Sequence, residues 1–430
     1  MVTLLKNLLA RHDRLSGIDP LTVPLKKLES ALEHVTEEEI RGRFRHDPWL
    51  ENFVLNVWEK VQGRTVLQSY PWHMALNLVD VCNAKCPFCP YWMFKSGVFD
   101  IADLPKLMKV VRYARTLILT GGEPTVHPRF PHIIKEFGKA VDPRCSFYMI
   151  TNGDRLARFK QELAQVNVGF SVSLNAATTA THSEIMGLGE DSFERILKSI
   201  RWLKSINRYV SLSFIVMRPN IHEIPEFLDL SHDLNVDCIY LRTLTPTQGL
   251  TEVLPDYLEL APYLHPQFEQ LRERAVRAIE QSRIPIQTAP EQWSAPILLD
   301  SSETKGSWEF NQAYQPAMSD EKKLMTKGER LMEQLSRLDP WLQDMGDPYR
   351  REHPFSCNLV YYSTQILEQS MKMYACCFMP RVPGFEEMRV AATDDFFELW
   401  NSPALVQLRR SLQQGPLYPA CKTCTYQLEY

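Results

Sequence analysis

The amino-acid sequence predicts an α/β protein built around a partial (β/α)6 barrel of the TIM type. Three features of the chain support this prediction. Short apolar runs alternate with amphipathic helical patterns from about residue 70 onward, as in a parallel sheet with crossover helices. Residues 1–68 show helical spacing alone, and residues 351–430 hold five of the ten cysteines. We therefore expect an N-terminal helical extension before the barrel and a small cysteine-rich domain after it.

Six predicted strands define the barrel, which we assign to residues 69–284. The strands are His73–Val79, Leu117–Leu119, Ser146–Ile150, Val168–Leu174, Val210–Val216 and Asp237–Leu241. The helical patterns are Leu104–Tyr113, Phe130–Ala140, Leu156–Ala164, Ser192–Ser205 and Glu223–Asn235, with a last helix at Gln267–Gln281. Right-handed crossovers curl such a sheet toward a barrel, whose active site lies at the C-terminal ends of the strands. Chemical motifs should therefore directly follow strands.

The segments on either side of the barrel have patterns of their own. In the N-terminal extension, Thr36 and Glu39 are spaced as a capping box, which predicts a helix start. Residues 285–350 are assigned as a bridging insertion between the barrel and the C-terminal domain, residues 351–430.

The bulk composition narrows the functional class. A net charge of −4 over 430 residues gives no general attraction to nucleic acid or anionic lipid, so we expect neither partner. No apolar run approaches the roughly 18 residues that cross a membrane. The apolar N-terminal stretch is interrupted by Lys6 and Asn7 and shows no cleavage pattern, so we expect a cytoplasmic protein.

The ten cysteines are expected to be reduced, because the sequence shows no export signal. Metal-binding or catalytic roles therefore come first. Eight of the cysteines fall into two groups, one of three residues and one of five. The groups are Cys82, Cys86 and Cys89, and Cys357, Cys376, Cys377, Cys421 and Cys424. The remaining two, Cys145 and Cys238, stand alone in apolar segments and are expected in the core.

The first group directly follows the first predicted strand. Cys82, Cys86 and Cys89 form a C-x3-C-x2-C run. Cysteine thiolates bind iron–sulfur clusters, and a four-iron cluster normally takes four of them. Three thiolates leave one iron open, and an open metal position is where a substrate or cofactor coordinates. Zinc knuckles more often use paired C-x2-C units, so the spacing favours a cluster.

This run after a first strand resembles the signature of the radical S-adenosylmethionine (SAM) superfamily. In that superfamily the open iron of a [4Fe–4S] cluster chelates the amino and carboxylate groups of SAM. Reductive cleavage then yields a 5′-deoxyadenosyl radical, which abstracts hydrogen from the substrate. The resemblance implies that Phe88 lies against the adenine and that a flavodoxin- or ferredoxin-type protein supplies the electron.

The second predicted strand leads into Gly121, Gly122 and Glu123, followed by Pro124. Glycines let a backbone approach a ligand closely, and a carboxylate accepts hydrogen bonds from an ammonium. The alternative is a simple Gly-Gly turn with a solvent-facing glutamate. The run resembles the GGEP motif of the superfamily, which binds the methionine amino group. The resemblance therefore assigns Gly121, Gly122 and Glu123 to SAM.

Later strand ends supply further candidates. The third strand ends in a Thr-Asn-Gly turn centred on Asn152, which resembles the TNG turn of the superfamily; an ordinary Asn-Gly turn is the alternative. Ser173 and Asn175 share one side of the fourth strand, where related enzymes place Ser and Asp against the ribose or carboxylate of SAM. Many relatives have Arg where this chain has Met186, so Arg195 on the next helix is the candidate for that cationic contact.

The second cysteine group offers one complete ligand set for a second cluster. Its four ligands would be Cys357, Cys376, Cys421 and Cys424. Cys377 is adjacent to Cys376, so their side chains diverge and only one of them serves. The segment resembles the auxiliary-cluster extensions called SPASM and twitch domains, with too few cysteines for the two clusters of a full SPASM domain. We expect one auxiliary [4Fe–4S] cluster in this small iron–sulfur domain; a structural zinc site with the same four cysteine ligands is the alternative. The stretch Leu359–Tyr362 is expected to be strand-like.

The resemblance implies an enzyme that abstracts hydrogen from an unactivated carbon. An auxiliary cluster fits a net oxidation such as dehydrogenation, whereas epimerisation needs a thiol hydrogen donor, for which Cys377 and Cys238 are candidates. No winged-helix leader-binding motif is evident near the N-terminus, which favours a sugar or secondary metabolite over a ribosomal peptide that is cross-linked or epimerised. A non-enzymatic zinc- or cluster-binding scaffold would have no use for the Gly-Gly-Glu turn.

Overall fold

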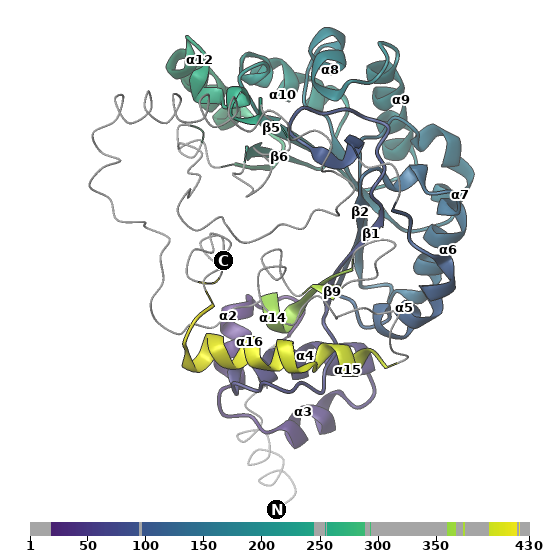
Figure 1. The fold of residues 1–430 in the computed structure, drawn as a ribbon, viewed down its shortest axis with the longest axis vertical. Coiled ribbons are helices and arrows are strands. Elements are labelled where there is room, and N and C mark those ends of the chain that lie inside the picture. Colours follow the sequence, from purple (N-terminus) through teal and green to yellow (C-terminus); the bar gives the residue numbers. More distant parts are fainter. Residues whose placement is uncertain are drawn as a thin grey trace, which may run out of the picture.

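A single sheet organises the molecule in the computed structural model (Figure 1). The structure describes residues 19–93, 97–244, 254, 256–288, 293, 359–366, 373–374, 395–418 and 421. Within these residues the strand order is β7-β6-β5-β4-β3-β2-β1-β8-β9, and every neighbouring pair is parallel except β8 and β9. The order has two ends, so the described strands form an open sheet, consistent with a partial barrel.

The six predicted strands of the barrel are confirmed. They correspond to β1 (His73–Val79), β2 (Thr116–Gly121), β3 (Ser146–Thr151), β4 (Gly169–Ser173), β5 (Val210–Val216) and β6 (Cys238–Thr243). The described residues add three short strands, β7 (Ile286–Gln287), β8 (Ser363–Ile366) and β9 (Met373–Tyr374). Consecutive strands from β1 to β6 pair side by side and in parallel, as expected for repeated right-handed crossover units. Their C-terminal ends therefore meet at one edge, which is where the site lies.

The helices of the barrel lie close to their predicted places. The helices of the barrel region are α5 (Leu104–Val111), α6 (Phe130–Ala140), α7 (Lys160–Ala164), α8 (Thr179–Met186), α9 (Ser192–Ser205), α10 (Ile224–Asp233) and α12 (Phe268–Gln281), of which α8 was not predicted. The described residues outside the barrel region form α2 (Leu25–Leu32), α3 (Glu37–Phe44), α4 (Pro48–Val61), α14 (Leu359–Tyr362), α15 (Phe396–Trp400) and α16 (Pro403–Gln414). Helices α5, α6, α7 and α9 cover the outer face of the sheet (Figure 1). The chain enters α7 and α10 through 3-10 turns, η4 (Leu156–Phe159) and η5 (Ile221–Glu223).

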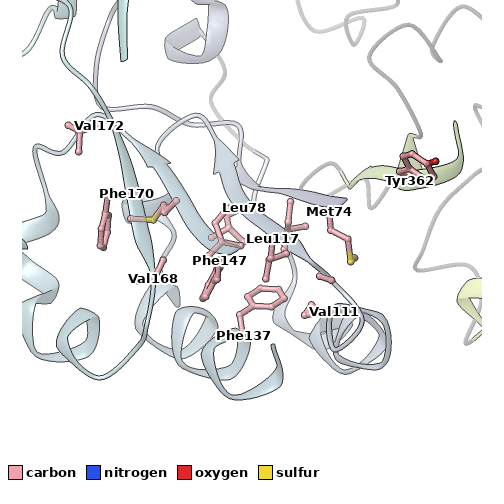
Figure 2. Close-up of a cluster of buried hydrophobic side chains, with 14 of the residues drawn as sticks. Met74, Leu78, Val111, Leu117, Phe137, Phe147, Val168, Phe170, Val172 and Tyr362 are labelled. Carbon is pink, nitrogen blue, oxygen red and sulfur yellow. The ribbon is translucent and has the colours of Figure 1, made fainter. Parts of the chain in front are cut away.

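The main core fills the space between the sheet and this outer helix layer. Figure 2 shows Leu117, Phe147 and Phe170 pointing from the strands toward the helices, where Val111 and Phe137 meet them. Each of these five side chains is at most 5% exposed. Burial of this kind stabilises by about 1.5–3 kcal/mol per large apolar side chain, which holds the strand ends in register.

The N-terminal helices and the described C-terminal residues pack together below the sheet (Figure 1). The capping box is confirmed: Thr36 Oγ1 accepts a hydrogen bond from the Glu39 N–H, and the Glu39 carboxylate accepts one from the Thr36 N–H. On α4, Asn56 donates to the Tyr361 carbonyl oxygen at 3.0 Å. Arg409 of α16 is fully buried and donates to the Thr65 carbonyl oxygen at 3.1 Å. The predicted domain boundaries remain predictions, but the two end segments share one core.

One local expectation about this region is wrong. The stretch Leu359–Tyr362 is the helix α14, and the strand β8 begins only at Ser363. Tyr361 and Tyr362 are both buried, at 2% and 4% exposure. Neighbouring residues of a half-buried strand point to opposite faces, so a helical turn is the better way to bury two consecutive aromatic side chains on α4.

Candidate functional site

The cysteine triplet lies in the loop that directly follows β1, as predicted. Cys82, Cys86 and Cys89 are all free; Cys86 is 9% exposed and the other two are half-buried. Local hydrogen bonds shape the loop: the Ala84 N–H donates to Cys82 Sγ at 3.4 Å, and the Trp92 indole donates to the Cys86 carbonyl oxygen at 3.0 Å. Three thiols are thus presented from one short loop at the C-terminal edge of the sheet.

Burial governs the protonation of the three thiols. Burial raises the pKa of the Cys82 thiol to about 11, and the nearby Glu123 and Cys89 add to the rise. Burial likewise raises the pKa values of Cys86 and Cys89. Buried thiolates are ligands when a metal offsets their charge, so the donor set fits an iron–sulfur cluster. Among the described residues, no three His, Cys, Asp or Glu side chains converge on a single metal ion.

The glycines after β2 lie directly against the backbone that leads into the triplet. Gly121 has φ +122°, and a Cβ atom there would lie 2.3 Å from the Val79 carbonyl oxygen. A Cβ on Gly122 would lie 2.3 Å from the Val81 carbonyl oxygen, and the Gly122 N–H donates to Val79 at 2.7 Å. The close approach expected for a ligand is therefore made, in this structure, to residues 79–81.

Glu123 is fully buried, at 0% exposure. Its carboxylate accepts four hydrogen bonds, which come from the N–H and hydroxyl of Thr125, the hydroxyl of Thr151 and the N–H of Asn152, at 2.5–3.1 Å. Desolvation by burial raises its pKa, against the effect of these donors. The solvent-facing alternative from the sequence is wrong, and the carboxylate joins the ends of β2 and β3.

Asn152 continues this network toward the first cysteine. Its side-chain amide donates to Asn83 Oδ1 at 2.8 Å and lies 3.9 Å from Cys82 Sγ. Asn83 in turn donates to Asp154 at 3.0 Å, and Asp154 pairs with Arg195 at 2.6 Å. Arg195 is thus engaged by Asp154 and reaches the triplet only through this chain of side chains.

The end of β4 holds the other predicted SAM contacts. Ser173 is half-buried at the last position of the strand. Asn175 is only 1% exposed; its amide oxygen accepts from the Ile215 N–H at 2.8 Å and its nitrogen lies 3.4 Å from the Met186 sulfur. A SAM contact from Asn175 would have to replace these bonds.

The C-terminal end of α8 packs on the cysteine loop, which the sequence did not reveal. Met186 Sδ lies 3.6 Å from Cys86 Sγ, and the Met186 carbonyl oxygen accepts from the Lys85 N–H at 2.8 Å. Gly187 follows with φ +58°, and a Cβ there would lie 2.8 Å from Lys85 Cβ. A Met-Gly pair at a helix end gives no sequence signal for a contact about 100 residues away.

A second, smaller hydrophobic cluster surrounds the triplet. Phe88 and Cys89 pack at its edge, and Tyr257 closes it from the 3-10 turn η6 (Tyr257–Leu260). Tyr257 is 3% exposed, and burial together with the nearby Cys89 raises its pKa. Tyr257 does not directly follow a described strand and belongs to no motif, so no signal in the sequence indicated it.

Most of the second cysteine group lies outside the described residues. These positions are Cys357, Cys376, Cys377 and Cys424. Cys421 is half-buried and packs on the main core.

Of the two lone cysteines, Cys145 is partly buried against the main core and Cys238 is buried, at 6% exposure. Cys238 is the first residue of β6, at the end of the sheet opposite the triplet. Its candidate role as a hydrogen donor stays a prediction.

The fold and the site together define a class: a parallel α/β sheet with a cysteine triplet in the loop after its first strand. Residues 76–231 match the model of the Radical SAM superfamily. This part of the chain therefore belongs to the radical SAM superfamily.

Two curated relatives match part of the chain. A probable GTP 3′,8-cyclase from Saccharolobus islandicus is 30% identical over 184 residues, which are 40% of this chain and 57% of the relative. The GTP 3′,8-cyclase of Mesorhizobium japonicum is 24% identical over 209 residues, 46% of this chain and 61% of the relative. The chain thus spans less than two thirds of the length of these relatives.

A solved structure extends the likeness in fold to most of the chain. Streptococcus suis SuiB bound to S-adenosylmethionine superposes with a TM-score of 0.51 at 15% identity, covering 92% of this chain and 84% of SuiB. At this identity the likeness concerns the fold.

No helix in the described part of the chain is long and apolar enough to span a membrane.

Proposed function

We propose that the chain is a radical SAM enzyme in which Cys82, Cys86 and Cys89 hold a [4Fe–4S] cluster with one open iron. The observation that carries the proposal is the triplet of free cysteines in the loop after β1, with the Gly121-Gly122 turn packed on the backbone that leads into it. With cluster and cofactor bound, the chemistry supplied is one-electron cleavage of SAM to methionine and a 5′-deoxyadenosyl radical, which removes a hydrogen atom from a substrate carbon.

The protein's own residues position the cofactor and exclude water. Phe88, beside the third cysteine, is the residue proposed to lie against the adenine, and Ser173 is proposed to contact SAM from the end of β4. The hydrophobic cluster around the triplet, which includes Met186 and Tyr257, packs against the cysteines and is proposed to limit the access of solvent to them. Exclusion of water protects a reactive radical from side reactions.

We propose a small-molecule substrate, such as a sugar or secondary metabolite, and a net oxidation such as dehydrogenation. The sequence relatives named as GTP 3′,8-cyclases support a small molecule. A modified peptide is the second candidate, because a SuiB structure is described as bound to the precursor peptide SuiA and shares the fold. The electron would come from a flavodoxin- or ferredoxin-type protein in the cytoplasm.

An auxiliary [4Fe–4S] cluster belongs to the oxidative form of the proposal. Its ligands would be Cys357, Cys376, Cys421 and Cys424. Cys377 would replace Cys376 as a ligand or serve as a hydrogen donor. Hydrogen abstraction leaves one unpaired electron on the substrate, so a two-electron oxidation needs an acceptor for the second electron. The auxiliary cluster would be that acceptor.

Anaerobic reconstitution tests the proposal. Wild-type protein, reduced with dithionite and given SAM, should form 5′-deoxyadenosine. Cys86→Ala should lose it, while Cys145→Ala, a partly buried cysteine before β3, should keep it. Seven to eight irons per chain, as expected for two four-iron clusters, would support the auxiliary cluster. About four irons with one zinc per chain would contradict it and support a zinc site in its place. Wild-type protein that loads iron but never cleaves SAM would refute the proposal.

A further inference from the structure

The Glu123 carboxylate has little room for a ligand. Oε1 accepts three hydrogen bonds, from the Thr125 N–H at 3.1 Å, the Thr125 hydroxyl at 2.5 Å and the Thr151 hydroxyl at 2.8 Å. Oε2 accepts from the Asn152 N–H at 2.7 Å. A carboxylate oxygen accepts about two hydrogen bonds, so Oε1 is saturated. With 0% exposure, the group has no open side toward solvent.

The partners of Glu123 belong to the strand ends that frame the cysteine loop. Its own N–H donates to the Val81 carbonyl oxygen at 3.0 Å, one residue before Cys82. Thr151 and Asn152 lie at the end of β3. Asn152, held by Glu123 through its N–H, directs its side-chain amide to Asn83 at 2.8 Å and to Cys82 Sγ at 3.9 Å. One buried residue thereby fixes both the chain before Cys82 and a donor beside its sulfur.

We propose that Glu123 is a positioning residue for Cys82, that its carboxylate acts through Asn152, and that this carboxylate does not bind the SAM ammonium. The inference rests on the proposed cluster at the triplet and concerns how this chain holds it. Partners behind the ligands orient them, and loss of such a partner typically lowers metal affinity or activity 10- to 100-fold. The consequence is specific: Glu123 matters to the cluster before any SAM is present.

The test measures iron loss to a chelator from reconstituted protein without SAM, with the EPR spectrum of the reduced cluster recorded alongside. Glu123→Gln keeps the size of the side chain and replaces one acceptor oxygen by an NH2 group, which cannot accept from Asn152 or the threonines. We expect iron loss about 10-fold faster than in wild type. Thr151→Val, which removes one donor to Glu123, should change iron loss in the same direction by less.

A matched control separates positioning from general destabilisation. Glu59 of α4 is also buried, at 2% exposure, and its carboxylate accepts from the Gln68 N–H and from Ser69, far from the triplet in the N-terminal helices. Glu59→Gln should lower thermal stability and leave iron loss at the wild-type rate. Equal acceleration in Glu59→Gln would overturn the inference.

The competing account predicts a different pattern. If the Glu123 carboxylate bound SAM directly, Glu123→Gln would weaken SAM binding and leave the SAM-free cluster unchanged in iron loss and EPR. That pattern would overturn the inference. If Glu123→Gln does not fold, the test rests on Thr151→Val. Iron loss from Thr151→Val at the wild-type rate would contradict the inference. Wild-type protein that forms no four-iron cluster would instead refute the proposed function.

Discussion

At the scale of single residues, the site depends on the close approach of two backbone segments, the end of β2 and the residues that lead into the cysteine loop. Gly121 and Gly122 bring the end of β2 within hydrogen-bond reach of residues 79–81. A side chain at either position would meet a carbonyl oxygen of the main chain, which cannot rotate away. The two glycines therefore allow β2 to pack closely on the backbone that leads into the cysteine loop, whether or not a ligand is bound.

A glycine pair tests this interpretation. Gly122→Ala should lower the free energy of unfolding and the iron content after reconstitution, because its Cβ would lie 2.3 Å from the Val81 carbonyl oxygen. Gly42→Ala is the control: Gly42 lies inside α3 with nothing within 4 Å of a Cβ, so the change should stabilise by about 0.5–1 kcal/mol. Denaturant unfolding and iron analysis measure both. Unchanged iron content in Gly122→Ala would contradict the assignment.

The site residues that the sequence identified and those it missed differ in how far along the chain their partners lie. The triplet and the Gly-Gly-Glu run are local patterns that directly follow strands, so their spacing, position and resemblance to the superfamily motifs indicated them. The partners of Glu123 lie 28 and 29 residues further along the chain at Thr151 and Asn152, and Met186 lies 100 residues from Cys86. Such contacts depend on how the strand ends come together, which periodicity does not encode.

At the scale of elements, hydrophobic periodicity predicted the barrel well. The strand His73–Val79 and the helices Phe130–Ala140 and Ser192–Ser205 have the predicted bounds. The helix α14 was missed because four apolar and aromatic residues fit a strand or a buried helical turn equally well. Packing against α4 decided between the two.

The contact between α15 and the loop that joins α4 to β1 provides a prediction at this scale. The Asn401 side chain accepts from the Leu67 N–H at 2.7 Å and donates to the Leu67 carbonyl oxygen at 2.8 Å. Asn401→Ala leaves both backbone groups without these partners, which should cost about 1–3 kcal/mol of unfolding free energy. Asn401→Asp keeps one acceptor and should cost less. Equal stability of Asn401→Ala and wild type in urea would contradict the role of this contact.

At the scale of the whole molecule, ionic contacts tie the helical extension to the barrel. Arg144, before β3, pairs with Asp47 at the start of α4 and with Asp142, and its guanidinium lies 4.3 Å from the Trp49 ring centre. The Arg144 side chain lowers the pKa values of both carboxyl groups. We therefore expect a pH-dependent contribution from these ion pairs to the stability of the N-terminal helices.

The pH dependence follows from these lowered pKa values. A carboxylate whose pKa falls on folding stabilises fully above its unfolded pKa, and loses that contribution as pH falls through its folded pKa. Arg144→Gln should therefore lose stability above about pH 5, by at most about 1 kcal/mol since the pairs are partly exposed. The difference from wild type should vanish as the pH falls well below about 3.9.

Thermal unfolding across pH measures this effect. Arg112→Gln is the control, because Arg112 and Arg144 line one surface pocket and the Arg112 guanidinium lies over the Tyr113 ring. It should show no comparable pH-dependent loss. An Arg144→Gln defect that stays constant down to pH 2 would instead indicate packing on Trp49 as the main contribution.

The central claim is that the triplet leaves one iron open to SAM. EPR spectroscopy of the dithionite-reduced, reconstituted protein before and after SAM addition tests it most directly. The account predicts a four-iron cluster signal that depends on Cys82, Cys86 and Cys89 and changes its g-values when SAM binds. A signal that SAM leaves unchanged, with no 5′-deoxyadenosine formed, would contradict the account.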